Sequence, residues 1–139
     1  MSAESMPARP LPRFPEPDTE PFYAGCREHR LTYQVCRDCG GIVFYPRSHC
    51  THCTGTNLEW RESAGRGSIY SFTVMRQHGH PFYKTRLPMP VALVDLDEGF
   101  RMFAEIVGSD PDALRVGQRV QVSWLDEDGV SLPAFRPAQ

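Results

Sequence analysis

The chain has 139 residues, is 40% hydrophobic and carries a net charge of −2, from 15 basic and 17 acidic residues. This length suits one ordinary domain or two very small ones, and the balanced charge gives no general attraction to nucleic acid or to an acidic membrane surface. Because no apolar run approaches the roughly 20 residues that cross a bilayer, we expect no membrane segment.

The first segment, residues 1–17, is rich in proline. Its five prolines exclude a helix interior and a central strand, so we expect a flexible leader. The N-terminus also lacks the basic start and apolar core of a secretion signal. Together with cysteines spaced as metal ligands, this predicts a reducing, cytoplasmic location.

Residues 18–30 predict a short helix, with Asp18 as its cap. Phe22 and Cys26 fall on one face at i, i+4 spacing, and Tyr23 lies beside them. Cys26 is the odd one of five cysteines. We interpret it as a small buried apolar residue rather than as a reactive thiol.

Two Cys-x-x-Cys pairs follow, separated by ten residues. Each pair can wrap a tight turn around one metal ion, and together they supply four thiolates at tetrahedral angles. The spacing predicts a structural zinc site, closed to water, with iron or a metal-free set of cysteines as the alternatives. The predicted ligands are Cys36, Cys39, Cys50 and Cys53.

Short β-type runs at 31–35 and 42–45 alternate with these two turns, which is the plan of a rubredoxin-like zinc ribbon over residues 31–62. A ribbon of this size has almost no hydrophobic core, so the metal must stabilise it. His49 and His52 are expected to be exposed residues and not ligands, because four cysteines already complete the site.

Residues 63–139 read as mainly β, with alternating or continuous apolar runs separated by turn residues. A helical turn at 109–114 falls between the third and fourth runs. Five mostly antiparallel strands with that insertion predict an OB-fold barrel. The expected strands are 68–75, 91–96, 100–107, 119–125 and 130–135.

A long loop at 76–90 is basic and aromatic and contains no acid. Loops of this length in compact domains are often functional. It could contact the phosphates of a nucleotide-like cofactor such as coenzyme A, bind nucleic acid, or be a solvated or partner-contacting loop. Its candidates for CoA phosphate contact are Arg76, Lys84 and Arg86.

Catalytic motifs are missing from the sequence. It has no serine-nucleophile elbow, no zinc-protease motif and no glycine-rich phosphate loop. Its two acidic clusters, 95–98 and 126–128, adjoin glycines at turns, where acids are common for local reasons. We therefore expect no catalytic residue in this chain acting alone.

The order of motifs along residues 19–137 resembles a family of zinc-ribbon and OB-fold proteins associated with acyl-CoA enzymes, known as domain of unknown function thirty-five. The second cysteine pair differs slightly, with Thr51 and Thr54 where the family often has Pro and Gly. The matching motifs are Phe22-Tyr23, Cys36-x-x-Cys39-Gly40, Tyr45-Pro46-Arg47, Cys50-x-x-Cys53, Gly65-Arg66-Gly67, the run 91–99 and Phe135-Arg136-Pro137.

This resemblance implies an accessory role beside a thiolase-fold enzyme, which carries the catalytic residues of a thiolase or of a steroid side-chain aldolase. It implies a structural zinc ion, an acyl-CoA held by the complex, a heterotetramer of two plus two subunits, and partner contact through Phe22 and Tyr23. A single-stranded nucleic-acid-binding module is the alternative, and the acidic balance disfavours it.

Overall fold

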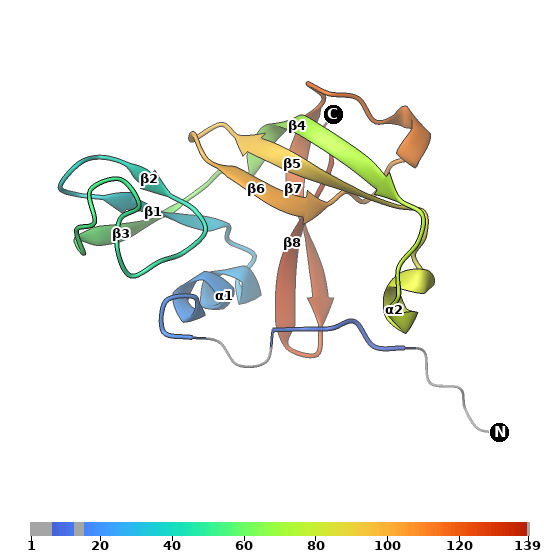
Figure 1. Ribbon diagram of the computed structural model, residues 1–139, viewed down its shortest axis with the longest axis horizontal. Coiled ribbons are helices and arrows are strands. Elements are labelled where there is room, and N and C mark those ends of the chain that lie inside the picture. The colour runs from blue at the N-terminus through green and yellow to red at the C-terminus, as the bar shows by residue number, and fades with distance from the viewer. Residues whose placement is uncertain (1–6, 13–15, 139) are drawn as a thin grey trace.

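The structure is a computed structural model that describes residues 7–12 and 16–138. Figure 1 shows a small three-stranded sheet beside a larger five-stranded one, with helix α1 next to both. The predicted mainly β architecture, with an N-terminal helix, a four-cysteine ribbon and an OB barrel, is confirmed. None of the helices in the described chain has the length and apolar character that a membrane crossing requires.

Helix α1 spans Glu20–Arg27, fewer residues than predicted. The expected cap is wrong, because Thr19 and not Asp18 occupies the N-cap position, without a side-chain capping bond. A turn just upstream starts the helix instead, as the Thr19 and Glu20 N–H groups both donate to the Glu16 carbonyl at 2.9 Å. The predicted inward face is present, since the buried residues of α1 include both members of its i, i+4 pair.

The zinc ribbon consists of β1 (Thr32–Cys36), β2 (Ile42–Val43) and β3 (Leu58–Glu62), in the antiparallel order β2-β1-β3. Sequence reasoning missed β3 as a strand. Its residues pair with the whole of β1, from Thr32 opposite Glu62 to Cys36 opposite Leu58. This pairing carries the chain from the second cysteine turn back toward the barrel.

The barrel sheet has the order β6-β5-β4-β7-β8, and all neighbouring strands are antiparallel. The edges of the sheet approach each other after β6, where Ile106 bridges to Phe135 and the Val107 N–H donates to the Phe135 carbonyl at 2.8 Å. The strands are β4 (Arg66–Met75), β5 (Met89–Leu96), β6 (Arg101–Glu105), β7 (Arg119–Glu127) and β8 (Val130–Pro137).

Two short helical segments interrupt the strands. The 3-10 turn η1, Pro111–Ala113, lies between β6 and β7, as the sequence predicted. The long loop contains one turn of helix, α2 (Pro81–Lys84), which the sequence did not predict. His80 caps it, because its imidazole accepts the Phe82 N–H at 3.1 Å.

Ribbon, helix and barrel share one hydrophobic core. Phe44 of the ribbon stacks on Phe100 of the barrel with ring centroids 4.8 Å apart, and it meets Phe22 of α1 edge-on at 5.7 Å. Tyr33 of β1 stacks on the same Phe100 at 4.8 Å. A second, much smaller cluster surrounds the metal ligands and contains Cys36, Val43 and Cys50, with Leu58 against it.

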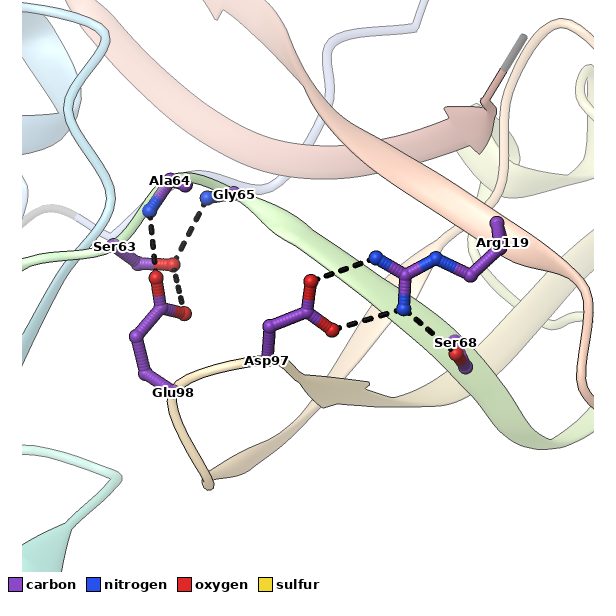
Figure 2. Close-up of polar contacts among 7 residues, drawn as sticks. All are labelled: Ser63, Ala64, Gly65, Ser68, Asp97, Glu98 and Arg119. Atoms are coloured by element: carbon purple, nitrogen blue, oxygen red, sulfur yellow. Dashed lines mark hydrogen bonds and ion pairs between the residues drawn. The ribbon is translucent and has the colours of Figure 1, made fainter.

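A polar junction fixes the link between ribbon and barrel (Figure 2). The Glu98 carboxylate, in the β5–β6 turn, accepts the Ser63 hydroxyl at 2.7 Å and the Ala64 N–H at 2.8 Å. The Ser63 hydroxyl oxygen in turn accepts the Gly65 N–H at 2.9 Å. Three successive linker residues are thereby held by one turn of the barrel.

The described part of the proline-rich segment, residues 7–12, contains one buried side chain, Arg9, which is 6% exposed. Its guanidinium lies 3.3 Å from Glu127 and 3.6 Å from Glu105, and 4.6 Å above the Phe82 ring. These contacts join the segment to β7, β6 and α2, and Figure 1 shows it passing the tip of the β7–β8 hairpin and α2. Residues 1–6 and 13–15 of the predicted leader lie outside the described residues.

Candidate metal centre and surface sites

The four predicted ligands meet at one point. Their sulfur atoms all lie within 4.8 Å of one another, and Cys36–Cys53 and Cys39–Cys50 are each separated by 3.6 Å. These separations are far longer than an S–S bond of about 2.05 Å and close to the roughly 3.8 Å edge of a tetrahedron with Zn–S bonds of about 2.3 Å. The arrangement fits a structural zinc ion with no open position.

Backbone N–H groups in both cysteine turns point toward the cysteine sulfur atoms. The Gly41 N–H points to the Cys39 sulfur at 3.4 Å and the His52 N–H to the Cys50 sulfur at 3.3 Å. Burial opposes ionisation of Cys50, but N–H groups of Cys53 and His52 and the Cys39 and Cys53 thiols outweigh it and lower the pKa of that thiol to about 6. A low thiol pKa favours the form that binds metal. At Cys53 the Gly55 N–H favours ionisation, but the three neighbouring thiols and burial raise the pKa to about 12, so without metal the ionisation of one thiol disfavours that of its neighbours.

The two turns have matching backbones. Gly40 follows the first pair with φ +76° and Thr54 follows the second with φ +63°. Glycine adopts this left-handed conformation without strain, whereas Thr54 adopts it with a side chain attached. His52 is not among the clustered groups in the described chain, and its Nε2 lies 3.0 Å from the Ile42 carbonyl.

Cys26 lies apart from the metal ligands. It is 0% exposed within the shared core, and burial raises the pKa of its thiol to about 12. A thiol in these surroundings stays protonated at neutral pH, as expected of a buried apolar residue.

The two residues predicted to touch a partner differ in exposure. Phe22 is 8% exposed and packs against Tyr23, at a centroid distance of 5.4 Å, and against Phe44 of its own chain. Tyr23 is only half-buried and borders the shared core. Of the pair, Tyr23 is the one with surface available to another subunit, and partner contact by either stays a prediction.

The three basic residues predicted to contact CoA do not form one cluster. Arg86 is paired with Glu105 and sits 5.7 Å from the Phe82 ring centre. Arg76 faces Asp112 across 3.9 Å, and Lys84 is exposed on α2. Contact between these side chains and CoA stays a prediction.

An aromatic face, which sequence reasoning missed, covers the outside of β4, β5 and β6 beside the ribbon. Tyr45, Tyr70 and Phe103 are 48%, 51% and 56% exposed. The Phe103 N–H donates to the Tyr45 hydroxyl at 2.8 Å. This hydrogen bond connects the ribbon to β6, the edge strand of the barrel sheet. The Arg101 guanidinium lies 3.5 Å above the Tyr70 ring. The available signal was Phe103, an aromatic ring at an odd position of the strand 100–107, on the face opposite to its buried residues.

Comparison with known proteins identifies both halves of this architecture. Residues 24–59 match the model of the rubredoxin-like zinc ribbon domain of ChsH2, and residues 60–125 match that of the ChsH2 C-terminal OB-fold domain. A DUF35 domain-containing scaffold protein of Methanothermobacter thermautotrophicus is 33% identical over 116 residues, which cover 79% of this chain and 86% of that protein. The chain belongs to the DUF35 family.

Two further relatives of this DUF35 chain are named after enzymes, one an aldolase and the other an enoyl-CoA hydratase subunit. A solved structure titled Ltp2-ChsH2(DUF35) aldolase matches with a TM-score of 0.83 and 32% identity, covering 92% of this chain and 100% of that one. A probable enoyl-CoA hydratase alpha subunit of Thermomonospora curvata is 36% identical over 118 residues. These residues cover 84% of this chain but only 36% of that relative, so the chain spans about a third of its length.

Proposed function

We propose that this chain is a non-catalytic accessory subunit of an acyl-CoA enzyme whose catalytic subunit has a thiolase fold. The single observation that carries the proposal is the match, over 100% of its length, to the DUF35 chain of a solved aldolase. The reaction would form or break a carbon–carbon bond next to a CoA thioester, as in retro-aldol shortening of a steroid side chain. In a cytoplasmic assembly of two plus two subunits, this chain would stabilise the enzyme and help to hold acyl-CoA.

Its chemistry agrees with a supporting role. The four sulfurs at the metal centre complete a tetrahedron, which leaves no position for a water or substrate. Two carboxylates near the junction are already engaged within the chain, Asp97 by Arg119 and Glu98 by the Ala64 N–H. The site supplies rigidity rather than an acid, a base or a nucleophile.

The aromatic face is the surface we assign to the thiolase-fold subunit. Exposed aromatic and arginine side chains are the residue types that protein interfaces favour. Phe103 is the most exposed ring of the face, and Leu93 lies directly opposite it on β5. Because Tyr45 of the ribbon contributes to the same face, a bound partner would contact both halves of the chain at once.

The test is affinity purification of the tagged full-length chain from its source cells, followed by mass spectrometry and by light scattering of the recovered complex. We expect a thiolase-fold protein in equal amount, with a mass of two copies of each chain. Phe103→Ser should reduce that recovery at least about tenfold, since interface hot spots contribute about 2 kcal/mol or more.

Val116→Ser is the matched control, because Val116 is 66% exposed but lies outside the aromatic face, so recovery should be unchanged. Equal recovery with Phe103→Ser and the wild type would show that the partner binds elsewhere. Recovery of nucleic acid, or of no thiolase-fold protein in repeated purifications, would overturn the accessory role.

A further inference from the structure

A hollow of about 680 Å³ opens on the outer face of the barrel where β4, β7 and β8 lie side by side. Three of the side chains that line it are arginines, Arg66, Arg119 and Arg136. They come from three different strands and belong to no motif that the metal centre or the aromatic face uses.

Strand register places the three arginines on one face. Arg66 of β4 is directly opposite Gln121 of β7, and Gln121 is directly opposite Arg136 of β8. Residues in such a row have Cβ atoms about 5 Å apart on the same side of the sheet. Arg119 lies two residues before Gln121 and therefore shares this side, whereas Val120 between them is 0% exposed and faces the core.

Close backbone packing fixes the position of Arg66. It is flanked by Gly65, whose φ is +76°, and by Gly67, where a Cβ would collide with the Asp95 carbonyl. A Cβ at Gly65 would likewise meet the Val122 side chain. Strand β4 can lie this close to β5 and β7 only because both neighbours of Arg66 in the sequence lack a side chain.

One carboxylate balances the three guanidinium groups. Arg119 donates to Asp97 at 2.9 and 2.7 Å and to Ser68 at 3.0 Å (Figure 2), which leaves its Nε–H and one Nη2–H free. Neither Arg66 nor Arg136 forms an ion pair within the described residues 7–12 and 16–138. Hydrogen bonds from Arg119 and the charges of Arg119 and Arg66 hold the pKa of Asp97 below its usual value.

Counted over the described residues, the three arginines and Asp97 give the hollow a net charge of about +2 on a chain whose total is −2. Like charges on adjacent strands are unfavourable unless an anion lies between them. Planar guanidinium groups match phosphate oxygens in pairs, and they bind them more strongly than neutral donors do.

We propose that this arginine hollow, formed by Arg66, Arg119 and Arg136, binds a small ligand that carries two or more phosphate groups. Arg119 would be the fixed donor, held by Asp97, and the two unpaired arginines would close on the phosphates from either side. The choice of ligand rests on the proposed function, because an acyl-CoA enzyme binds acyl-CoA, a molecule that carries several phosphate groups. The site lies apart from the loop arginines named from the sequence.

The experiment is isothermal titration of the zinc-loaded full-length chain with inorganic pyrophosphate and with adenosine 3′,5′-bisphosphate. We expect both to bind, with an affinity that falls as salt is raised. Arg66→Gln/Arg136→Gln should weaken binding at least about tenfold, since each lost charge-assisted contact is worth more than that factor. Arg76→Gln/Lys84→Gln removes the same charge from the loop and tests the loop residues that the sequence suggested. The matched control is Arg27→Gln/Arg30→Gln, which removes the same charge from exposed positions at the end of α1 and should bind like the wild type.

Loss of binding in the loop variant alone, or no binding of either probe, would overturn the hollow as a phosphate site. Neither result would contradict the accessory role, because affinity purification of the thiolase-fold partner tests that role separately. Binding of a single-stranded oligonucleotide at least tenfold more tightly than pyrophosphate, with loss in Arg66→Gln/Arg136→Gln, would overturn the small-ligand assignment in favour of nucleic acid. Thermal unfolding of each variant confirms that a lost signal is not lost folding.

Discussion

At the scale of single residues, Arg9 shows how one side chain can attach a proline-rich segment to a barrel. Its side chain is 5% exposed and faces two carboxylates, Glu105 and Glu127, with an aromatic ring on its flat side. Glu105 is also almost buried, at 10% side-chain exposure, and it is shared with Arg86. A buried charge held in this way is costly to leave unpaired.

We predict that Arg9→Ala lowers the free energy of unfolding by about 1–3 kcal/mol, because it leaves Glu105 with one cation in place of two and removes the contact with Phe82. Urea denaturation followed by circular dichroism measures this. Arg30→Ala is the control, since Arg30 is 51% exposed and its pair with Glu28 should contribute less than about 1 kcal/mol. Equal stability of the Arg9→Ala variant and wild type would mean that the segment is not anchored.

The sequence predicts some of these residues and not others for a physical reason. The four cysteines were identified because metal ligation needs thiols at short, fixed spacing, which is visible along the chain. Arg9 and Glu127 are 118 positions apart, so no local pattern connects them. The arginine hollow was missed for the same reason, as its members meet only through the registers of β4, β7 and β8.

At the scale of elements, the β5–β6 turn positions the ribbon relative to the barrel. Its Glu98 carboxylate holds Ser63 and Ala64, which connect β3 to β4 (Figure 2). Acids beside a glycine looked like ordinary turn residues in the sequence. The structure shows that one of them reaches 34 positions back along the chain to the linker.

Glu98→Gln should destabilise the protein by about 1–2 kcal/mol, because a neutral amide accepts hydrogen bonds less strongly and its NH2 group cannot accept at all. The loss should be local, so we expect hydrogen exchange to speed up more at the Ala64 amide than at the amides of β4. Glu28→Gln, an exposed acid next to α1, provides the comparison and should change stability by less than about 0.5 kcal/mol. Unchanged exchange at Ala64 would contradict a locking role for Glu98.

Strand β3 illustrates where element prediction fails. Its five residues are all intermediate or exposed, so they lack the buried alternation by which strands are recognised. The pairing with β1 decides its structure instead. The barrel strands, by contrast, carry buried faces and turn residues, and five of them were predicted near their observed positions.

At the scale of the whole molecule, the cysteine turns of the ribbon and the barrel are stabilised by different interactions. Leu31, Tyr33 and Val35 of the ribbon belong to the main core together with the barrel residues. The cysteine turns depend on a cluster of only three buried residues, two of them ligands. Too little apolar surface is buried there to order the turns without a metal.

Zinc removal by a chelator should therefore disorder the cysteine turns and β2 while α1 and the barrel stay folded. Hydrogen exchange should speed up across 36–57 and remain slow at Val94 and Val120, both of which are 0% exposed. Iodoacetamide at pH 8 should then modify the four ligands but not Cys26, because Cys26 is 0% exposed in the shared core and burial raises the pKa of its thiol. Addition of zinc should restore protection to all four ligands. Simultaneous loss of protection in the barrel, or alkylation of Cys26, would show instead that the metal holds the shared core and not only the turns.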